Sequence, residues 1–168
     1  MDEVDRLRLD DQLCFALYAA TNAITRRYRP LLGRLGLTYP QYLVMLVLWQ
    51  DGPCSVGEVA RRLELEPHAV GPLVTRLATA GLVQRRPGAD RRRTVVSLTD
   101  AGRALEAGAA RVQAEVACAT GLDPDGLHAL RRRLRALAAE LADTGPAATM
   151  TPPRRPGRGS TAVEGDAS

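Results

Sequence analysis

The sequence predicts a mainly α-helical fold that carries one small β-hairpin. Apolar residues recur at intervals of three or four over much of residues 10–143, which is typical of amphipathic helices. The period becomes strand-like at 82–86 and 94–98, on either side of a short turn. A chain of 168 residues can bury one sizeable core. We therefore expect one domain over residues 1–143, followed by a tail at 144–168.

The N-terminal third predicts two helices. The first is expected over residues 10–33, with Asp10 or Asp11 as its N-cap. A second, strongly apolar helix should run over residues 39–49, because Pro suits a first helical turn. The sequence Asp-Gly-Pro at 51–53 then favours a turn.

Two short helices separated by a tight turn follow. Ser55 is a good N-cap, and Glu58 lies three residues on, as in a capping box, for a helix that ends near Leu63. The next helix is expected over residues 67–80, with a Pro in its first turn and Gly81 after its end. This arrangement predicts a helix-turn-helix.

Two further helices and a tail complete the predicted chain. Thr99 should cap a long helix that reaches about Ala119, and residues 121–124 separate it from a last helix that ends near Asp143. Residues 144–168 are rich in Pro, Gly, Ala, Thr and Arg. They bury too little apolar surface to offset the entropy of ordering, so we expect disorder.

Composition excludes several classes of protein. The 23 cations are all arginine and stand against 19 acidic residues, a mild excess of +4. No apolar run is long enough to span a bilayer and the first residues are acidic, so we expect a cytoplasmic protein that does not bind membranes. The three cysteines lack the spacing of a zinc site or a disulfide framework, so neither a metal nor another cofactor is expected.

The helix at 67–80 and the basic hairpin that follows it suit duplex DNA. The major groove admits an α-helix, and an arginine-bearing loop can enter the narrower, more negative minor groove. Asp90 could hold the Arg92 guanidinium in a fixed direction. The alternative is an ordinary solvated hairpin. The candidate DNA-binding residues are Pro67, His68, Ala69, Thr75, Arg76, Arg85, Arg86, Asp90, Arg91, Arg92 and Arg93.

The order of elements, the Asp-Arg-Arg sequence at 90–92 and the Ser-Leu-Thr-Asp-Ala-Gly sequence at 97–102 resemble the MarR family of dimeric bacterial regulators. The resemblance implies a winged helix-turn-helix in an intertwined helical homodimer that binds a pseudo-palindromic operator. It also implies that residues 67–80 enter the major groove and that Arg92 enters the minor groove. His68 departs from the small hydroxylated residues expected in that helix, which leaves the operator sequence open.

Residues 12–18, 28–30 and 37–42 resemble the organic-hydroperoxide-sensing branch of that family more specifically. The resemblance implies that Cys14 is oxidised to a sulfenic acid, that a disulfide or mixed disulfide follows, and that the repressor then releases DNA. It also implies that tyrosines surround the thiol, here Tyr18, Tyr28 and Tyr39. Cys118 is the candidate resolving thiol, although a core or unreactive surface cysteine is an equal alternative.

The chemistry of Cys14 can be considered separately from the family. Near a helix N-terminus a thiolate is favoured by the peptide dipoles, whereas the two preceding aspartates oppose it. Tyrosine hydroxyls that donate to the sulfur would offset this repulsion. Tyr18 shares a helix face with Cys14, but Tyr28 lies fourteen residues on, about 21 Å along a straight helix. A pocket that holds both Cys14 and Tyr28 must therefore be built by two subunits.

Two other functions compete with this hypothesis. A MarR-type repressor could be released by a non-covalently bound phenolic ligand, with Cys14 merely packed nearby. A thiol peroxidase would use Cys14 as its nucleophile, but no His, Thr or Arg set lies near that cysteine in sequence, so we do not expect an enzyme. Cys54 lies beside a proline in a turn, and nothing in the sequence supports it as a sensing or a resolving thiol.

Overall fold

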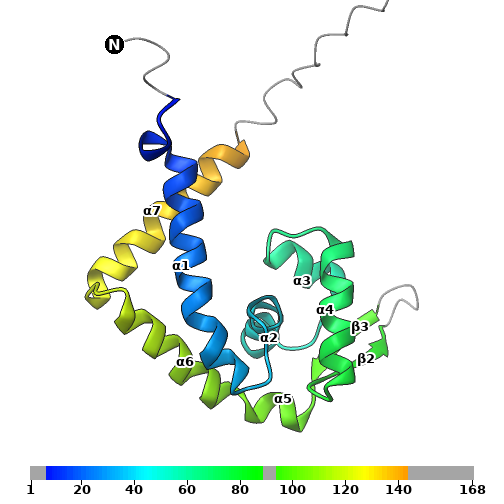
Figure 1. Ribbon diagram of the computed structural model, residues 1–168. Helices are drawn as coiled ribbons and strands as arrows, with labels where there is room; N and C mark the ends of the chain where they lie inside the picture. The colour runs from blue at the N-terminus through cyan, green and yellow to red at the C-terminus, as the bar shows by residue number, and fades with distance from the viewer. Residues whose placement is uncertain (1–6, 89–93, 144–168) are drawn as a thin grey trace, which may run out of the picture. The chain divides into compact units, whose positions relative to one another are not determined.

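A computed structural model describes residues 7–88 and 94–143 (Figure 1). The chain divides into two units, one that ends at Asp123 and one that begins at Pro124. The mainly helical fold with a small hairpin is confirmed. The elements in chain order are η2 (Leu9–Asp11, a 3-10 helix), α1 (Leu13–Gly33), α2 (Tyr39–Asp51), β1 (Cys54–Ser55), α3 (Val56–Arg62), α4 (Pro67–Thr79), β2 (Val83–Pro87), β3 (Thr94–Leu98), α5 (Asp100–Ala104), α6 (Glu106–Ala119) and α7 (Pro124–Asp143).

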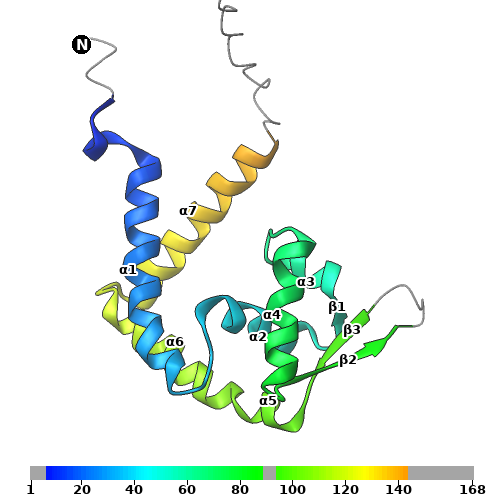
Figure 2. The same ribbon diagram turned by 45° about the vertical axis from the view of Figure 1, so that its right-hand side comes forward.

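Helix α1 begins later than the apolar pattern suggested. Its N-cap is Gln12, whose backbone is extended, so the prediction that Asp10 or Asp11 caps the helix is wrong. Both aspartates lie in the preceding 3-10 turn η2 and therefore lack the extended backbone that an N-cap requires. The helix then runs without interruption to Gly33 (Figures 1 and 2).

Helix α2 is the centre of the core. A capping box starts it: the Thr38 N–H donates to Gln41 Oε1 (2.8 Å), and the Gln41 N–H donates to Thr38 Oγ1 (3.4 Å). A helix that is apolar on all sides must be buried. The buried residues of α2 are Tyr42, Val44, Met45, Val47 and Leu48.

The helix-turn-helix predicted from the capping signals is present. The Ser55 N–H donates to Glu58 Oε2 (2.7 Å) and the Glu58 N–H donates to Ser55 Oγ (3.2 Å), so the predicted capping box of α3 is confirmed. Helix α4 begins at Pro67, as expected, and Gly81 follows it with a positive φ of 73°. The buried face of α4 contacts α2 and α3.

The hairpin forms part of a three-stranded antiparallel sheet with strand order β1-β3-β2. β2 pairs with β3 from Val83 opposite Leu98 to Pro87 opposite Thr94. The two-residue strand β1 pairs Cys54 with Val96 and was not predicted. Two residues beside a proline carry no strand periodicity of their own, because their pairing depends on β3, forty residues away in sequence.

The helix expected from Thr99 to about Ala119 is two helices, and that prediction is corrected. Thr99 does cap the first, since its Oγ1 accepts from the Gly102 N–H (3.1 Å). Leu105 then separates α5 from α6. Helix α6 packs against α1 (Figure 2) and adds its apolar face to the core of the first unit.

Candidate DNA-binding surface and thiol site

Helix α4 divides its residues cleanly between the core and the surface. Val70, Val74 and Leu77 are buried at intervals of three and four residues. The opposite face is left to the solvent, where it can meet a partner. The five DNA-binding candidates predicted on this helix are all exposed: Pro67, His68, Ala69, Thr75 and Arg76.

One arginine of the hairpin is held against this helix. Arg85 Nη1, from β2, donates to Thr75 Oγ1 (3.2 Å), and the same hydroxyl donates to the Gly71 carbonyl (3.0 Å). A threonine hydroxyl can accept and donate at once, so this contact ties the strand to the helix. Arg86 Nη2 instead donates to Gln84 Oε1 along its own strand (3.1 Å). The side chains of the two predicted arginines of β2 therefore differ in their partners: Arg85 is bonded to α4, whereas Arg86 is bonded within its own strand.

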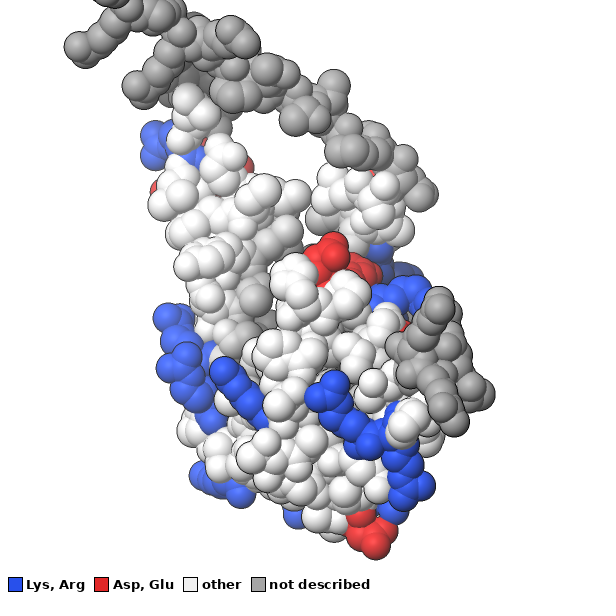
Figure 3. Space-filling model, turned by 90° about the vertical axis from the view of Figure 1, so that its right-hand side faces the viewer, with Lys and Arg blue, Asp and Glu red and all other residues white. Residues whose placement is uncertain are grey.

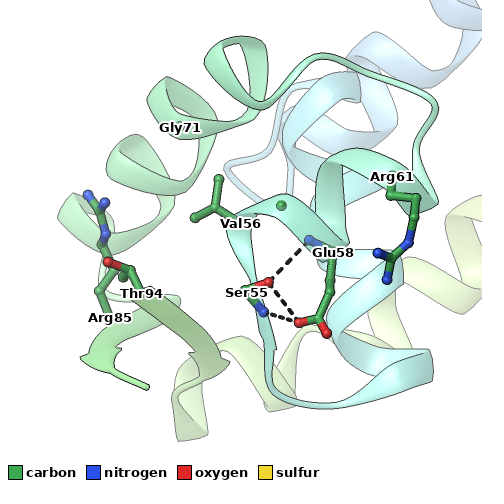
Figure 4. Close-up of a pocket in the computed structure, with 8 residues that line it drawn as sticks. Ser55, Val56, Glu58, Arg61, Gly71, Arg85 and Thr94 are labelled. Atoms are coloured by element: carbon green, nitrogen blue, oxygen red, sulfur yellow. Dashed lines mark hydrogen bonds between the residues drawn. The ribbon is translucent and has the colours of Figure 1, made fainter. Parts of the chain in front are cut away.

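A cavity of about 550 Å³ lies between α3, α4 and the sheet (Figure 4). Figure 4 shows Arg61 of α3 and Arg85 of β2 on opposite sides of it. The Glu58 carboxylate also lines the cavity, but it accepts from the Ser55 N–H and Oγ–H in the capping box (2.7 and 2.8 Å). A hollow bordered by two guanidinium groups suits an anionic group such as a phosphodiester.

The surface around α4 and the sheet carries clusters of basic side chains. Figure 3 shows them beside a largely uncharged area, with acidic side chains confined to smaller patches. This pattern favours a polyanion, because arginines contact phosphates while uncharged side chains can approach base edges. The predicted hairpin residues Asp90, Arg91, Arg92 and Arg93 lie outside the described residues.

Cys14 lies in the first turn of α1 and is exposed. Tyr18, one turn further on, is 66% exposed. Because α1 is continuous, Tyr28 lies about 21 Å along the helix from Cys14. The structure therefore does not bring Cys14 and Tyr28 together within one chain.

The predicted tyrosines at the other end of α1 form a cluster without the cysteine. The ring centroids of Tyr28 and Tyr39 are 5.2 Å apart, and that of Tyr42 lies 5.5 Å from Tyr28 and 6.2 Å from Tyr39. Trp49 extends the cluster, 6.4 Å from Tyr42. Sequence reasoning missed Tyr42 and Trp49, because both lie on an apolar helix that reads as core. For Tyr42 the signal was its spacing, since it lies three residues after Tyr39 and shares its helix face.

The cluster favours neutral phenols. Burial raises the pKa of Tyr39. Burial also raises the pKa of Tyr42, and the neighbouring Tyr28, which hydrogen-bonds to it, and Tyr39 add to that rise. Neutral phenols keep their protons at ordinary pH, so their hydroxyls are available as hydrogen-bond donors.

The other two cysteines differ in environment. Cys118 is exposed near the end of α6. Cys54 is half-buried, and burial raises the pKa of its thiol, as do the nearby Glu58 and Asp51 carboxylates. Within residues 7–88 and 94–143, no group of three or more His, Cys, Asp or Glu side chains could hold a metal ion. No helix in the described part of the chain is long and apolar enough to cross a membrane.

Comparison with known proteins agrees with this geometry. The profile of the MarR family matches residues 35–93, a range that begins just after α1 and ends just before β3. The HTH-type transcriptional regulator TtmR of Methylorubrum extorquens (strain PA1) is 44% identical over 138 residues, which are 82% of this chain and 71% of the relative. The organic hydroperoxide resistance transcriptional regulator of Bacillus subtilis (strain 168) is 38% identical over 106 residues, 62% of this chain and 72% of its own length.

A similar solved structure is that of reduced AbfR bound to DNA, from a protein of Staphylococcus epidermidis. It is 27% identical, has a TM-score of 0.69, and the match covers 84% of this chain and 99% of that one. The relatives are transcriptional regulators, which confirms that the chain is not an enzyme. The chain belongs to the MarR family of DNA-binding transcriptional regulators.

Proposed function

We propose that this regulator is a homodimeric repressor that releases its operator when an organic hydroperoxide oxidises Cys14. The observation that carries the proposal is the exposure of Cys14 at the N-terminal end of α1, about 21 Å along the helix from Tyr28, which forms the tyrosine cluster with Tyr39 and Tyr42 of α2. Two relatives support it. One is named for organic hydroperoxide resistance, and AbfR has been solved in reduced, overoxidised and disulfide-formed states.

A second copy of the chain would complete the thiol pocket. Leu13, Phe15 and Tyr18 surround Cys14 in sequence, and all three are exposed in the single chain, Leu13 by 59%. Large apolar side chains gathered on one stretch of surface favour an interface. In a two-fold dimer, each Cys14 would meet the Tyr28 and Tyr39 of the other subunit.

Helix α7 offers a second dimerisation surface. Leucines recur along it at alternating intervals of three and four residues, which is the heptad pattern of a coiled-coil seam. Such a stripe needs a partner helix. The five leucines are Leu127, Leu130, Leu134, Leu137 and Leu141, of which the last is 67% exposed.

The proposed oxidation balances with the hydroperoxide as oxidant. The Cys14 thiolate attacks the terminal peroxide oxygen, the O–O bond breaks, and the alkoxide leaves and takes a proton as the alcohol. Sulfur is oxidised by two electrons to a sulfenic acid. A second thiol, from Cys118 or a small cellular thiol, then forms a disulfide with release of water. The partner tyrosines donate to the thiolate before the reaction, can donate to the sulfenic oxygen after it, and lose that acceptor when the disulfide forms.

For DNA binding we assign roles by position. The exposed face of α4, with Pro67, His68, Ala69, Thr75 and Arg76, enters the major groove. Arg85 and Arg86 contact phosphates beside it. The hairpin tip, with Asp90, Arg91, Arg92 and Arg93, enters the minor groove. Two copies related by a two-fold axis read a pseudo-palindromic operator.

The test measures operator binding before and after cumene hydroperoxide, using a duplex obtained by binding-site selection from a random library. We expect the reduced wild type to bind, the oxidised wild type to release, and Cys14→Ser to bind in both states. Intact mass identifies the sulfur product. Cys54→Ser is the matched control and should respond as the wild type does. Release by Cys14→Ser equal to that of the wild type would refute the proposal.

Tyr28→Phe tests the two-subunit pocket. The variant keeps the ring and removes only the hydroxyl, so we expect the reduced protein to bind its operator normally and to require more hydroperoxide for release. Mixed dimers provide the control: a Cys14→Ser chain paired with a Tyr28→Phe chain retains one intact pocket if each pocket uses both subunits. Unchanged peroxide sensitivity of Tyr28→Phe would contradict the assignment.

One observation favours the ligand-responsive alternative. A second cavity, of about 330 Å³, is lined by Tyr42, Leu46, Trp49 and Gln50 of α2 and by residues of α6. Its aromatic and amide lining suits a small phenolic ligand. A regulator of this kind would still respond in the Cys14→Ser variant, so the experiment above separates the two functions.

A further inference from the structure

Trp49 joins the tyrosine cluster to a distant part of the chain. Its ring contacts Tyr42, and its indole Nε1–H donates to the carbonyl of Gly102 in α5 (3.1 Å), 53 residues away in sequence. We propose that Trp49 is a positioning residue that couples the state of the tyrosine cluster to the DNA-binding elements. The proposal rests on the redox function proposed above.

The Gly102 end of this link is fixed to both DNA-binding elements. The Thr99 N–H donates to the Leu82 carbonyl (3.1 Å), and Thr99 Oγ1 donates to the Gly81 carbonyl (2.6 Å) and accepts from the Gly102 N–H (3.1 Å). Gly102 is also packed so closely against the Leu82 carbonyl that a Cβ would overlap its oxygen. The end of α4, the start of β2 and the start of α5 therefore form one junction, made of Gly81, Leu82, Thr99 and Gly102.

The other end of the link lies in the cluster that we assign to the thiol pocket. Tyr42 contacts both Tyr28 and Tyr39, and its hydroxyl is hydrogen-bonded to Tyr28. Once the sulfur is in a disulfide it accepts hydrogen bonds only weakly, so the partner phenols must find new acceptors. Tyr42 is buried, so a shift of its neighbours is passed on by contact rather than absorbed by solvent.

Trp49 has room to respond. It is only partly buried and lines the cavity of about 330 Å³ described above. The buried side of α2 offers no such freedom, because Val44, Met45 and Leu48 are packed in the core. Movement along the Trp49 side of the helix therefore costs less than movement through the core, and its hydrogen bond carries the displacement to the junction.

The variant Trp49→Phe isolates the proposed step, because it keeps an aromatic ring beside Tyr42 and removes the N–H that donates to the Gly102 carbonyl. We expect the reduced variant to bind the selected operator. The Kd of the oxidised protein for the operator, divided by the Kd of the reduced protein, should be at least about fivefold smaller in the variant than in the wild type. Thr120→Val is the matched control. It removes two hydrogen bonds between a side chain and the backbone, to the Ala117 carbonyl and from the Leu122 N–H, outside the path, and should leave that ratio unchanged.

A second readout needs no change at the coupling residue, because Trp49 is the only tryptophan in the chain. We expect its emission to shift as one equivalent of cumene hydroperoxide is added to the wild type and to stay constant in Cys14→Ser. An emission that does not change during oxidation would overturn the coupling role, even if Trp49→Phe fails to fold.

The outcomes separate the two proposals. If the wild type releases DNA and Trp49→Phe releases it with the same Kd ratio, the coupling role is wrong and the redox function stands. If the wild type keeps its operator although mass shows Cys14 oxidised, both are wrong. If Trp49→Phe binds DNA, becomes oxidised at Cys14 and stays bound, the coupling is supported.

Discussion

The two ends of α1 both carry leucines, but those leucines have very different surroundings. At its C-terminal end Leu31 and Leu32 are buried, Leu32 completely. At its N-terminal end Leu13 and Tyr18 remain mostly exposed, although the helix is continuous between them. The chain's own core thus buries the two leucines of the C-terminal end, whereas Leu13 at the N-terminal end stays exposed.

The two ends differ in how far their own chain covers them. An apolar stripe in a sequence identifies a face that needs to be covered, but it does not tell which chain covers it. The C-terminal end is covered by α2 and α6 of the same chain. For the N-terminal end, where Cys14 lies, we propose a second copy, so the sensing thiol would sit in an interface rather than in a core.

The largest expected effect compares one leucine from each end. Leu32→Ala removes a fully buried side chain and should lower the free energy of unfolding by about 2–5 kcal/mol. Leu13→Ala should raise the dimer dissociation constant clearly, whereas it should change the free energy of unfolding of each chain much less than Leu32→Ala does. Chemical denaturation and sedimentation equilibrium measure the two quantities. If Leu13→Ala left the dissociation constant unchanged, the N-terminal end of α1 would not be the interface.

Most of the fold could be predicted where a helix boundary is set by local chemistry. The capping box at Ser55 and Glu58 and the start of α4 at Pro67 depend on residues within one turn of each other, and both were found. The strand β1 and the break at Leu105 could not be found in this way. Pairing with β3 and tertiary packing decide them, and no neighbouring residue signals either.

The candidate site was partly predictable for the same reason. The exposed residues of α4 follow from helical periodicity, and the distance between Cys14 and Tyr28 follows from the rise of a helix. Trp49 could not be recognised as part of the site, because its partner Gly102 lies 53 residues away. A hydrogen bond of that kind leaves no pattern in the sequence.

The contrast between a packed and an exposed face also applies to α4 and gives a second prediction. Arg85→Gln should weaken binding to all duplexes alike and reduce the slope of log K against log salt by about 0.9, as expected for one lost phosphate contact. Arg29→Gln, an exposed arginine on α1, is the control and should leave the slope intact. A slope in Arg85→Gln equal to that of the wild type would exclude the contact.

Thr75→Val sharpens the same point with a smaller effect. The variant keeps every charge but removes the hydroxyl that holds Arg85 against α4. We expect the salt slope to stay at the wild-type value while affinity falls by less than in Arg85→Gln. Fluorescence anisotropy over a range of salt concentrations measures both. If the slope changed, Thr75 would do more than orient Arg85.

The tyrosine cluster predicts a dependence of stability on alkaline pH. In the unfolded chain a phenol ionises near its ordinary pKa of about 10, whereas folding raises the pKa of Tyr42. Above that pH the unfolded state has lost a proton that the folded state keeps, so the free energy of unfolding falls as pH rises, by up to about 1.4 kcal/mol per pH unit for one group. Tyr42→Phe should make this fall shallower in urea titrations, and equal slopes would contradict the burial of its hydroxyl.

The smallest effect concerns which thiol reacts, and it extends the comparison to the cysteines. Cys54 is half-buried with a raised pKa, whereas Cys118 is exposed, so iodoacetamide should modify Cys54 more slowly at neutral pH. Raising the pH increases the thiolate fraction of Cys54 and should narrow the gap, and denaturant should abolish it. Peptide mass spectrometry after short labelling measures the order. Equal rates in the folded protein would show that the packing around β1 does not protect Cys54, and Cys54 would then compete with Cys118 as the second thiol of a disulfide.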